Sequence, residues 1–115
     1  MASHLSDICK SSKLSAEIKL NKEILINKNI EILENFKSTG FDNNYSSTVN
    51  EILISDSNKL KNILYDPQTN GPLLLSIHEK DQIEFEKKFQ LKLGFRPILI
   101  GKFKKSVGKL INVIE

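Results

Sequence analysis

The sequence feature that most constrains the fold is a polar loop, residues 65–71, that runs directly into the apolar stretch Leu73–Ile77. Pro67 fixes its own φ angle and moves the preceding residue out of the helical region, whereas Gly71 can adopt a positive φ angle at little cost. Pro72 then precedes the apolar stretch, which is short and bounded by turn residues, as a buried strand is. An ordered loop directly before a strand makes a turn or presents backbone N–H groups to an anion. We therefore predict a strand at 73–77 that is preceded by a candidate binding loop.

The chain has 115 residues, of which 39% are hydrophobic, and this is enough for one domain with a modest core. No apolar run approaches the roughly 20 residues that a membrane helix needs, and the first residues lack the basic and apolar segments of a secretory signal. The single cysteine, Cys9, excludes an internal disulfide and suits a reducing compartment, so we expect a cytoplasmic protein without a membrane partner. Cys9 has no basic or metal-binding partner near it in the sequence, and we interpret it as a small buried hydrophobe.

The net charge of +3 is a weak indication of nucleic-acid binding. Arg96 is the only arginine among the 17 basic residues, although contacts to phosphates and base edges favour arginine. The lysines are densest between residues 102 and 109, where we interpret them as a solvated surface. We therefore expect no nucleic-acid partner.

Apolar residues at helical spacing predict one helix over residues 3–13 and a second over 27–38. Isoleucines of one parity between residues 24 and 32 would also suit a strand, so the second region is ambiguous. Gly40 stands where a helix C-terminal glycine belongs, and it favours the helix. A short helical segment is predicted at 60–64.

A longer helix is predicted over residues 79–93, where Phe85 and Phe89 follow each other at i+4 spacing. Alternating apolar residues in the same run would favour a strand, but a strand of this length with four lysines and three glutamates would be unusual. Gly94 can end the helix, with Phe95 folding back as its hydrophobic partner.

Four strands are predicted, over residues 15–21, 73–77, 97–103 and 109–114. Residues 49–54 suit either a strand or a short helix, and residues 40–48 are predicted to be a polar loop anchored by Phe41 and Tyr45. Helices interleaved with strands predict a single α+β domain over residues 1–115, with two or three layers and a mixed sheet.

The sequence Asp66-Pro67-Gln68-Thr69-Asn70-Gly71, followed by Leu73-Leu74, closely resembles the Asp-Pro-Gln-Thr-Ser-Gly-Gly-Leu-Leu signature of selenophosphate synthetase (selenide, water dikinase). This signature lies in the carboxy-terminal domain that the family shares with the aminoimidazole ribonucleotide synthetase superfamily. His4-Leu5, Ser46-Ser47 and residues 94–103 are also similar to that domain, so the resemblance covers nearly the whole chain. It implies a layered α/β/α domain with a mixed, mainly antiparallel sheet.

By this resemblance, the full enzyme converts ATP, selenide and water into selenophosphate, AMP and phosphate, with magnesium. The family's catalytic cysteine or selenocysteine and its metal-binding aspartates lie in an amino-terminal ATP-binding domain, whose segments are absent from residues 1–115. We therefore expect no catalytic residue, no metal site and no bound cofactor in this domain alone, and Cys9 does not inherit the catalytic role. The missing ATP-binding domain is the expected partner, and the isolated domain is expected to be a monomer.

The resemblance makes one loop the candidate phosphate or ATP site, through Asp66, Gln68, Thr69, Asn70 and Gly71. Thr69 would contribute a hydroxyl donor and Gly71 a backbone donor that a phosphate can approach closely. Two departures matter: Asn70 replaces a serine, and Pro72 replaces the second glycine and has no N–H for an anion. These departures leave an alternative open, namely a divergent, non-catalytic binding or regulatory module, such as occurs in relatives fused to an NADH dehydrogenase.

Overall fold

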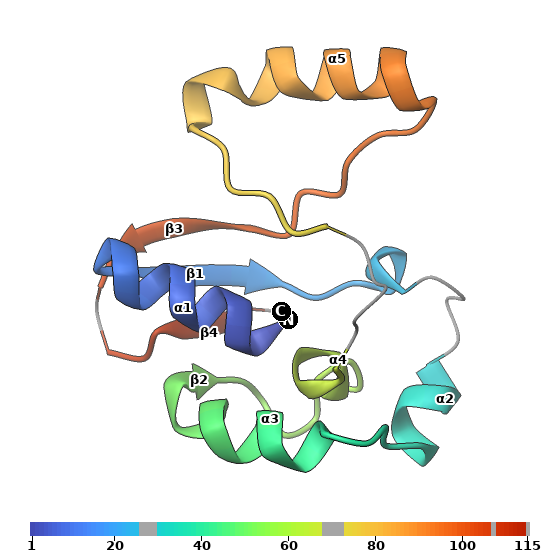
Figure 1. Ribbon diagram of the computed structural model, residues 1–115, viewed down its shortest axis with the longest axis vertical. Helices are drawn as coiled ribbons and strands as arrows, with labels where there is room; N and C mark the ends of the chain where they lie inside the picture. Colours follow the sequence, from blue (N-terminus) through green and yellow to red (C-terminus); the bar gives the residue numbers. More distant parts are fainter. Residues whose placement is uncertain (26–29, 68–72, 107, 115) are drawn as a thin grey trace.

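The computed structural model describes residues 1–25, 30–67, 73–106 and 108–114, and Figure 1 shows their arrangement. The described α-helices are α1 (Ala2–Ser12), α2 (Ile30–Asn35), α3 (Phe41–Thr48), α4 (Asn62–Tyr65) and α5 (Gln82–Leu93). The strands are β1 (Leu14–Lys19), β2 (Ile52–Leu53), β3 (Gly101–Lys105) and β4 (Ile111–Ile114). Three short 3-10 helices complete the described elements: η1 (Lys22–Ile24), η2 (Val49–Glu51) and η3 (Glu79–Asp81).

The four strands form one mixed sheet in the order β2-β4-β1-β3. β4 pairs in parallel with both β1 and β2, whereas β1 and β3 are antiparallel. The predicted α+β class and the mixed sheet are therefore confirmed, but the expectation of a mainly antiparallel sheet is wrong. The reason is that a short connection between β3 and β4 reverses the direction of the chain. In the sheet, however, β1 lies between these two strands. Because β1 is antiparallel to β3, it must be parallel to β4.

Side chains alternate along β1 and give the sheet one apolar and one polar face. Ala16 and Ile18 are buried, and the register places Phe103, Ile111 and Val113 on the same face. Glu17 points to the opposite face, where it forms ion pairs with Lys102 and Lys104 of β3. Only the apolar face can contribute to the core.

Helix α1 covers this apolar face and packs against β1 and β4, while α3 and α4 pack against α1 (Figure 1). Leu5 and Cys9 are buried, as the helical spacing predicts. Cys9 is fully buried, and its Sγ lies 3.5 Å from the carbonyl oxygen of Leu110. The interpretation of Cys9 as a small core residue is confirmed.

Residues 41–48, predicted as a loop, form helix α3 instead. Asparagine, serine and threonine are poor helix formers, which is why the sequence indicates a loop. The helix is stabilised by burial of Phe41 and Thr48, and the Thr48 hydroxyl donates a hydrogen bond to the Asn44 carbonyl at 2.6 Å. Gly40, with φ of 92°, precedes α3, whereas α2 has already ended at Asn35. The predicted role of Gly40 as the end of the preceding helix is therefore wrong.

The other predicted helices are found with changed bounds. The helix predicted over 27–38 is confirmed for 30–35, and residues 27–29 lie outside the described residues. Residues 49–54 contain both of the elements that were considered, since η2 is followed directly by β2. The prediction for 79–93 is confirmed: η3 leads into α5, Gly94 ends it at φ of 78°, and the Phe89 and Phe95 rings meet at 5.3 Å.

The strand predicted at 73–77 is not formed, because residues 73–78 have no regular secondary structure. Residues 96–100 likewise have no regular secondary structure, so β3 begins at Gly101 and not at residue 97, although the Ile100 carbonyl accepts a hydrogen bond from the Lys19 N–H at 2.7 Å. These two segments leave the sheet together and carry α5 away from it (Figure 1). We call residues 73–100 the arm.

Gly101 permits the close approach of β3 to β1. A Cβ atom at this position would lie 2.1 Å from the Glu17 carbonyl oxygen and 2.8 Å from the Ile18 Cα, both of which are backbone atoms. We predict that Gly101→Ala lowers the free energy of unfolding by about 3 kcal/mol, because β3 must move away from β1. Urea denaturation measures this change.

The control is Gly94→Ala, because Gly94 has a positive φ angle but no atom within 4 Å of the added Cβ. It should cost only about 1 kcal/mol, from the left-handed backbone alone. Equal losses in the two variants would show that the close approach has no energetic role.

Candidate functional site

The structure describes the first residues of the candidate loop and none of its central ones. Asp66 is placed, together with Pro67, whereas the other predicted site residues, Gln68, Thr69, Asn70 and Gly71, lie outside the described residues. Pro72 lies outside them as well. The site is therefore built here from the elements that hold the beginning of the loop.

Asp66 is held at the end of α4. Its N–H donates to the Asn62 carbonyl at 3.1 Å, and its backbone then turns to an extended conformation, as the residue before a proline does. Its Oδ1 accepts a hydrogen bond from the Ser38 hydroxyl, which comes from the segment between α2 and α3. The start of the loop is thus tied to a segment 28 residues earlier in the chain.

Tyr65, the residue before Asp66, anchors the loop to α3. It is only 3% exposed, and its ring makes edge-on contacts with Phe41 and Tyr45 at centroid distances of 5.8 and 4.9 Å. Its carbonyl accepts a hydrogen bond of 2.9 Å from the Asn44 side chain. Burial raises the pKa of the Tyr65 hydroxyl. Phe41 and Tyr45 were predicted to anchor a loop at residues 40–48, whereas they lie in helix α3 and contact Tyr65.

A polar hollow lies beside this anchor, at the start of α3. It is lined by Lys37, Ser38, Thr39, Gly40, Asp42 and Asn43. Pro67 adjoins it, since a Cβ at Gly40 would lie 3.6 Å from the Pro67 ring. A lysine, two hydroxyls and the first N–H groups of a helix favour an anion, whereas the Asp42 carboxylate, 3.9 Å from Lys37, opposes one. Sequence reasoning missed this hollow because it assigned Lys37 and Ser38 to a helix and residues 40–48 to a loop, so it did not place these side chains around the start of α3.

The N-terminal amino group lies on the same side of the molecule as Asp66. Burial lowers the pKa of the Met1 amino group, and the negative charge of Asp66 acts in the opposite direction. Residues 1 and 66 are therefore close enough to interact electrostatically, although α1, β1, α2 and α3 separate them in the chain.

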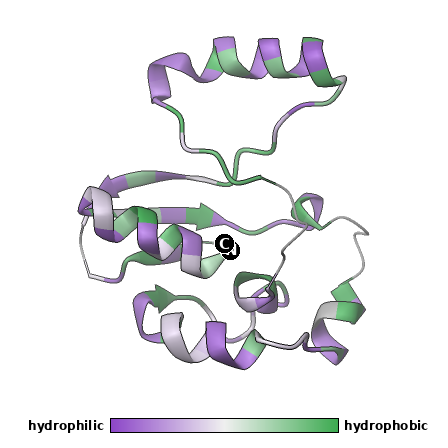
Figure 2. Cartoon of the chain, in the orientation of Figure 1, coloured by the Kyte–Doolittle hydropathy of each residue, from purple (hydrophilic) through white to green (hydrophobic). Residues whose placement is uncertain are grey.

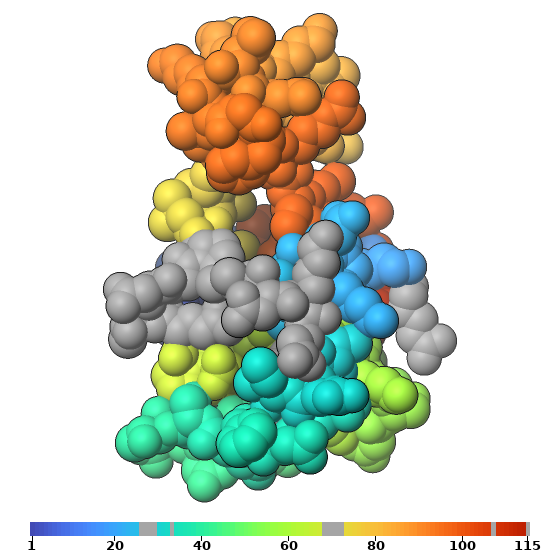
Figure 3. All heavy atoms as spheres, turned by 90° about the vertical axis from the view of Figure 1, so that its right-hand side faces the viewer, coloured from blue at the N-terminus to red at the C-terminus, as the bar shows by residue number. Residues whose placement is uncertain are grey.

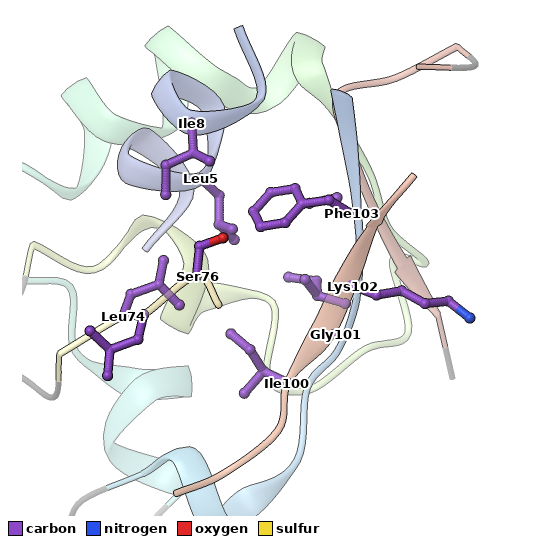
Figure 4. Close-up of a pocket in the computed structure, with 11 residues that line it drawn as sticks. Leu5, Ile8, Leu74, Ser76, Ile100, Gly101, Lys102 and Phe103 are labelled. Atoms are coloured by element: carbon purple, nitrogen blue, oxygen red, sulfur yellow. The ribbon is translucent and has the colours of Figure 1, made fainter. Parts of the chain in front are cut away.

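A second hollow, shown in Figure 4, lies between α1 and the base of the arm. Leu5 and Ile8 of α1 face Leu74, Ile100 and Phe103 across it, and its volume is about 360 Å³ including the part open to solvent. The Lys102 ammonium points away from it (Figure 4). This hollow offers apolar contacts and no charged group, so it is unsuited to a phosphate.

The described residues contain no group of three or more histidine, cysteine or acidic side chains that could hold a metal ion. Burial raises the pKa of the Cys9 thiol, which disfavours the reactive thiolate. A further polar cluster joins Ser6, Lys10 and Glu51 by a hydrogen bond and an ion pair, and it links α1 to η2. These groups have structural roles.

No described helix is both long enough and apolar enough to span a membrane. In comparisons with known proteins, no protein-family model matches the chain, and no curated protein matches it either.

One prediction concerns the reactivity of the Cys9 thiol. Because the thiol is buried and its pKa is raised, we expect it to react with a disulfide reagent about 100-fold more slowly in the folded chain than in urea. Ser55→Cys in a Cys9→Ser background is the matched control, since Ser55 is exposed, and it should react at the same rate in both conditions. Rapid reaction of native Cys9 would contradict its burial.

Another prediction concerns the contribution of Glu51 to stability at acid pH. The Lys10 ammonium, and then the Ser6 hydroxyl, hold the pKa of this carboxylate below its ordinary value, against the effect of burial. A carboxylate with a lowered pKa stabilises the fold above its ordinary pKa, and this contribution is lost as pH falls through the lowered value. We expect the free energy of unfolding to fall below about pH 4, and to fall less steeply in Glu51→Gln.

At pH 7, Glu51→Gln should lose about 1–2 kcal/mol of stability in urea denaturation. Glu84→Gln is the control, because Glu84 also has a lowered pKa, owing to Lys88, but its pair is exposed to solvent and screened. If both variants keep the acid dependence of the original chain, Glu51 does not contribute to it.

Proposed function

We propose that this chain is the carboxy-terminal domain of a selenophosphate synthetase-like enzyme, which uses ATP, selenide and water to form selenophosphate, AMP and phosphate. The observation that carries the proposal is the match between residues 66–71, followed by Leu73-Leu74, and the signature of that family. In this role the domain would help to close the ATP or phosphate site of a separate ATP-binding domain. The enzyme would act in the cytoplasm.

The surroundings of Asp66 support this role. The beginning of the loop is fixed by Ser38 and by the buried Tyr65, and it adjoins a hollow with a lysine and two hydroxyls at the start of α3. Holding the beginning of the loop in place reduces the entropic cost of presenting its central groups to a ligand. Thr69 would donate its hydroxyl and Gly71 its backbone N–H to a phosphate, with Asp66, Gln68 and Asn70 shaping the loop.

Magnesium and ATP belong to the ATP-binding domain in this proposal. The resemblance implies that the aspartates of that domain would hold magnesium. The layered α/β/α arrangement implied by the resemblance is also part of the proposal, with α1, α3 and α4 as one helical layer.

A second candidate function is a divergent, non-catalytic binding or regulatory module. Such a module would stand alone or form part of a fusion with an NADH dehydrogenase. The replacement of the second signature glycine by Pro72 favours it, because proline removes one N–H that an anion would need. The two candidates differ in whether the loop contributes to turnover.

The test begins with the mass of the native polypeptide, detected in cell extract by an antibody against this domain. A species far heavier than 13.1 kDa would identify the parent protein, and AMP release that depends on selenide would then be measured on that protein. We expect Thr69→Ala to lower its kcat by about tenfold, which corresponds to about 1.4 kcal/mol. Ser55→Ala, an exposed hydroxyl outside the loop, should leave kcat unchanged.

Pro72→Gly separates the two candidates. It should raise turnover if the loop binds phosphate, because it restores a backbone donor. If neither Thr69→Ala nor Pro72→Gly changes turnover, the non-catalytic module is supported. The chain of residues 1–115 alone should form no selenophosphate, and AMP release by this chain alone would refute the assignment of the chemistry to another domain.

A further inference from the structure

The arm holds α5 apart from the body of the molecule. Two views at right angles show α5 as a lobe that a narrow connection joins to the sheet (Figures 1 and 3). None of the residues of α5 is buried, and Figure 2 shows apolar and polar residues interspersed along it. Most of the exposed large apolar side chains among the described residues lie between Leu73 and Leu99. This exposed apolar surface favours a second conformation in which more of it is buried.

The pairing of β1 with β3 continues beyond the end of β3 at the base of the arm. Its register matches Ile18 with Gly101, so the next pair in the same register is Lys19 with Ile100. The Lys19 N–H already donates a hydrogen bond of 2.7 Å to the Ile100 carbonyl, although β3 begins only at Gly101. The first bond of a longer antiparallel ladder is therefore present.

The next pairs in this register are Leu20 with Leu99 and Asn21 with Ile98. Asn21 already has the extended backbone of a strand, with φ of −137° and ψ of 167°. Hydrogen-bonded and non-hydrogen-bonded pairs alternate in an antiparallel ladder, so Asn21 and Ile98 would form the next hydrogen-bonded pair. Pro97 would precede this pair, and proline is tolerated at the beginning of a strand because its missing N–H is not needed there.

The same continuation would bury Leu99. This residue has the parity of Gly101 and Phe103, which lie on the apolar face of the sheet. Leu20, directly after β1, is only 8% exposed, whereas Leu99 is 67% exposed. The Cα atoms of a non-hydrogen-bonded pair are about 4.5 Å apart, so the side chains of Leu20 and Leu99 would be in contact.

We propose that the arm has a second, closed conformation in which β3 begins at Ile98 instead of Gly101. In this closed state, Ile98 and Asn21 exchange backbone hydrogen bonds, and Leu99 packs against Leu20 on the apolar face. Residues 98–100 then belong to β3, so the connection between α5 and the sheet becomes shorter and the arm is drawn towards the sheet. Closure buries an exposed leucine of the arm without a second molecule.

The closed state also changes the surroundings of the apolar hollow shown in Figure 4. Ile100 and Gly101 line this hollow at the base of the arm. Leu99 is the next residue on the face of Gly101, so closure adds an apolar side chain to the edge of the hollow. The inference does not depend on the proposed synthetase function, because it uses none of residues 66–72.

The first test is a disulfide across the closed pair, made in the full chain with Cys9→Ser to remove the native thiol. Leu20→Cys with Leu99→Cys gives two cysteines at the Cα separation that a disulfide requires. Leu20→Cys with Ile98→Cys is the matched control, because residue 98 would point to the opposite face of the sheet. We expect the first pair to oxidise within single chains at least about tenfold faster than the control pair, as non-reducing electrophoresis and thiol titration measure.

The second test is amide hydrogen exchange, measured by nuclear magnetic resonance. In the closed state the Ile98 N–H donates to the Asn21 carbonyl and is protected. Leu99→Asp opposes closure, since it would bury a carboxylate beside Leu20, and it should make the Ile98 N–H exchange at least about tenfold faster. Leu91→Asp is the matched control, because Leu91 is 86% exposed and belongs to the arm but not to these pairs, and it should leave the exchange rate unchanged.

Three results would overturn the proposal. The first is an equal oxidation rate for the two cysteine pairs. The second is a disulfide that forms only between chains, as it would if another molecule and not the sheet covered the arm. The third is an exchange rate of the Ile98 N–H that is the same in the original chain and in Leu99→Asp.

Discussion

The structure depends on β4 lying between β1 and β2. Ile111 of β4 is fully buried and pairs with Ala16 on one side and Ile52 on the other, so a single residue joins segments from the beginning, the middle and the end of the chain. Helix α1 packs over this row and buries Cys9 against it. The candidate loop follows from this arrangement indirectly, because α3 and α4, which hold Tyr65 and Asp66, pack on α1.

The elements that depend on residues close together in the sequence could be predicted, whereas those that depend on contacts between distant segments could not. Helix α1, strand β1 and helix α5 were predicted because their apolar spacing and end residues, such as Gly94, are local signals. Helix α3 was missed because it is stabilised by the burial of Phe41 and Thr48 against distant segments, which outweighs the poor helix propensity of its residues. The direction of the strands was also missed, since it follows from β1 lying between β3 and β4, which no local pattern encodes.

The same distinction applies to the candidate site. The sequence of residues 66–71 predicts a binding loop, but residues 68–71 lie outside the described ones, and Phe41 and Tyr45 were predicted to anchor residues 40–48 and not to contact Tyr65. The contacts that fix the beginning of the loop could not be predicted, because Ser38 and Asn44 are far in the sequence from Asp66 and Tyr65, which they contact. The arm shows the converse case: Leu73, Leu75 and Ile77 have the alternation of a strand, but they are exposed and unpaired with the sheet.

The central place of β4 has a consequence for synthesis on the ribosome. Because β4 follows every other strand in the chain, Ala16 and Ile52 emerge long before the residue that will separate and bury them. A nascent chain that ends within the arm can form α1 and α3 but lacks both strands that pair with β1, and its apolar sheet residues are open to wrong pairing. The two parallel strand pairs therefore form only after residue 111 has been synthesised.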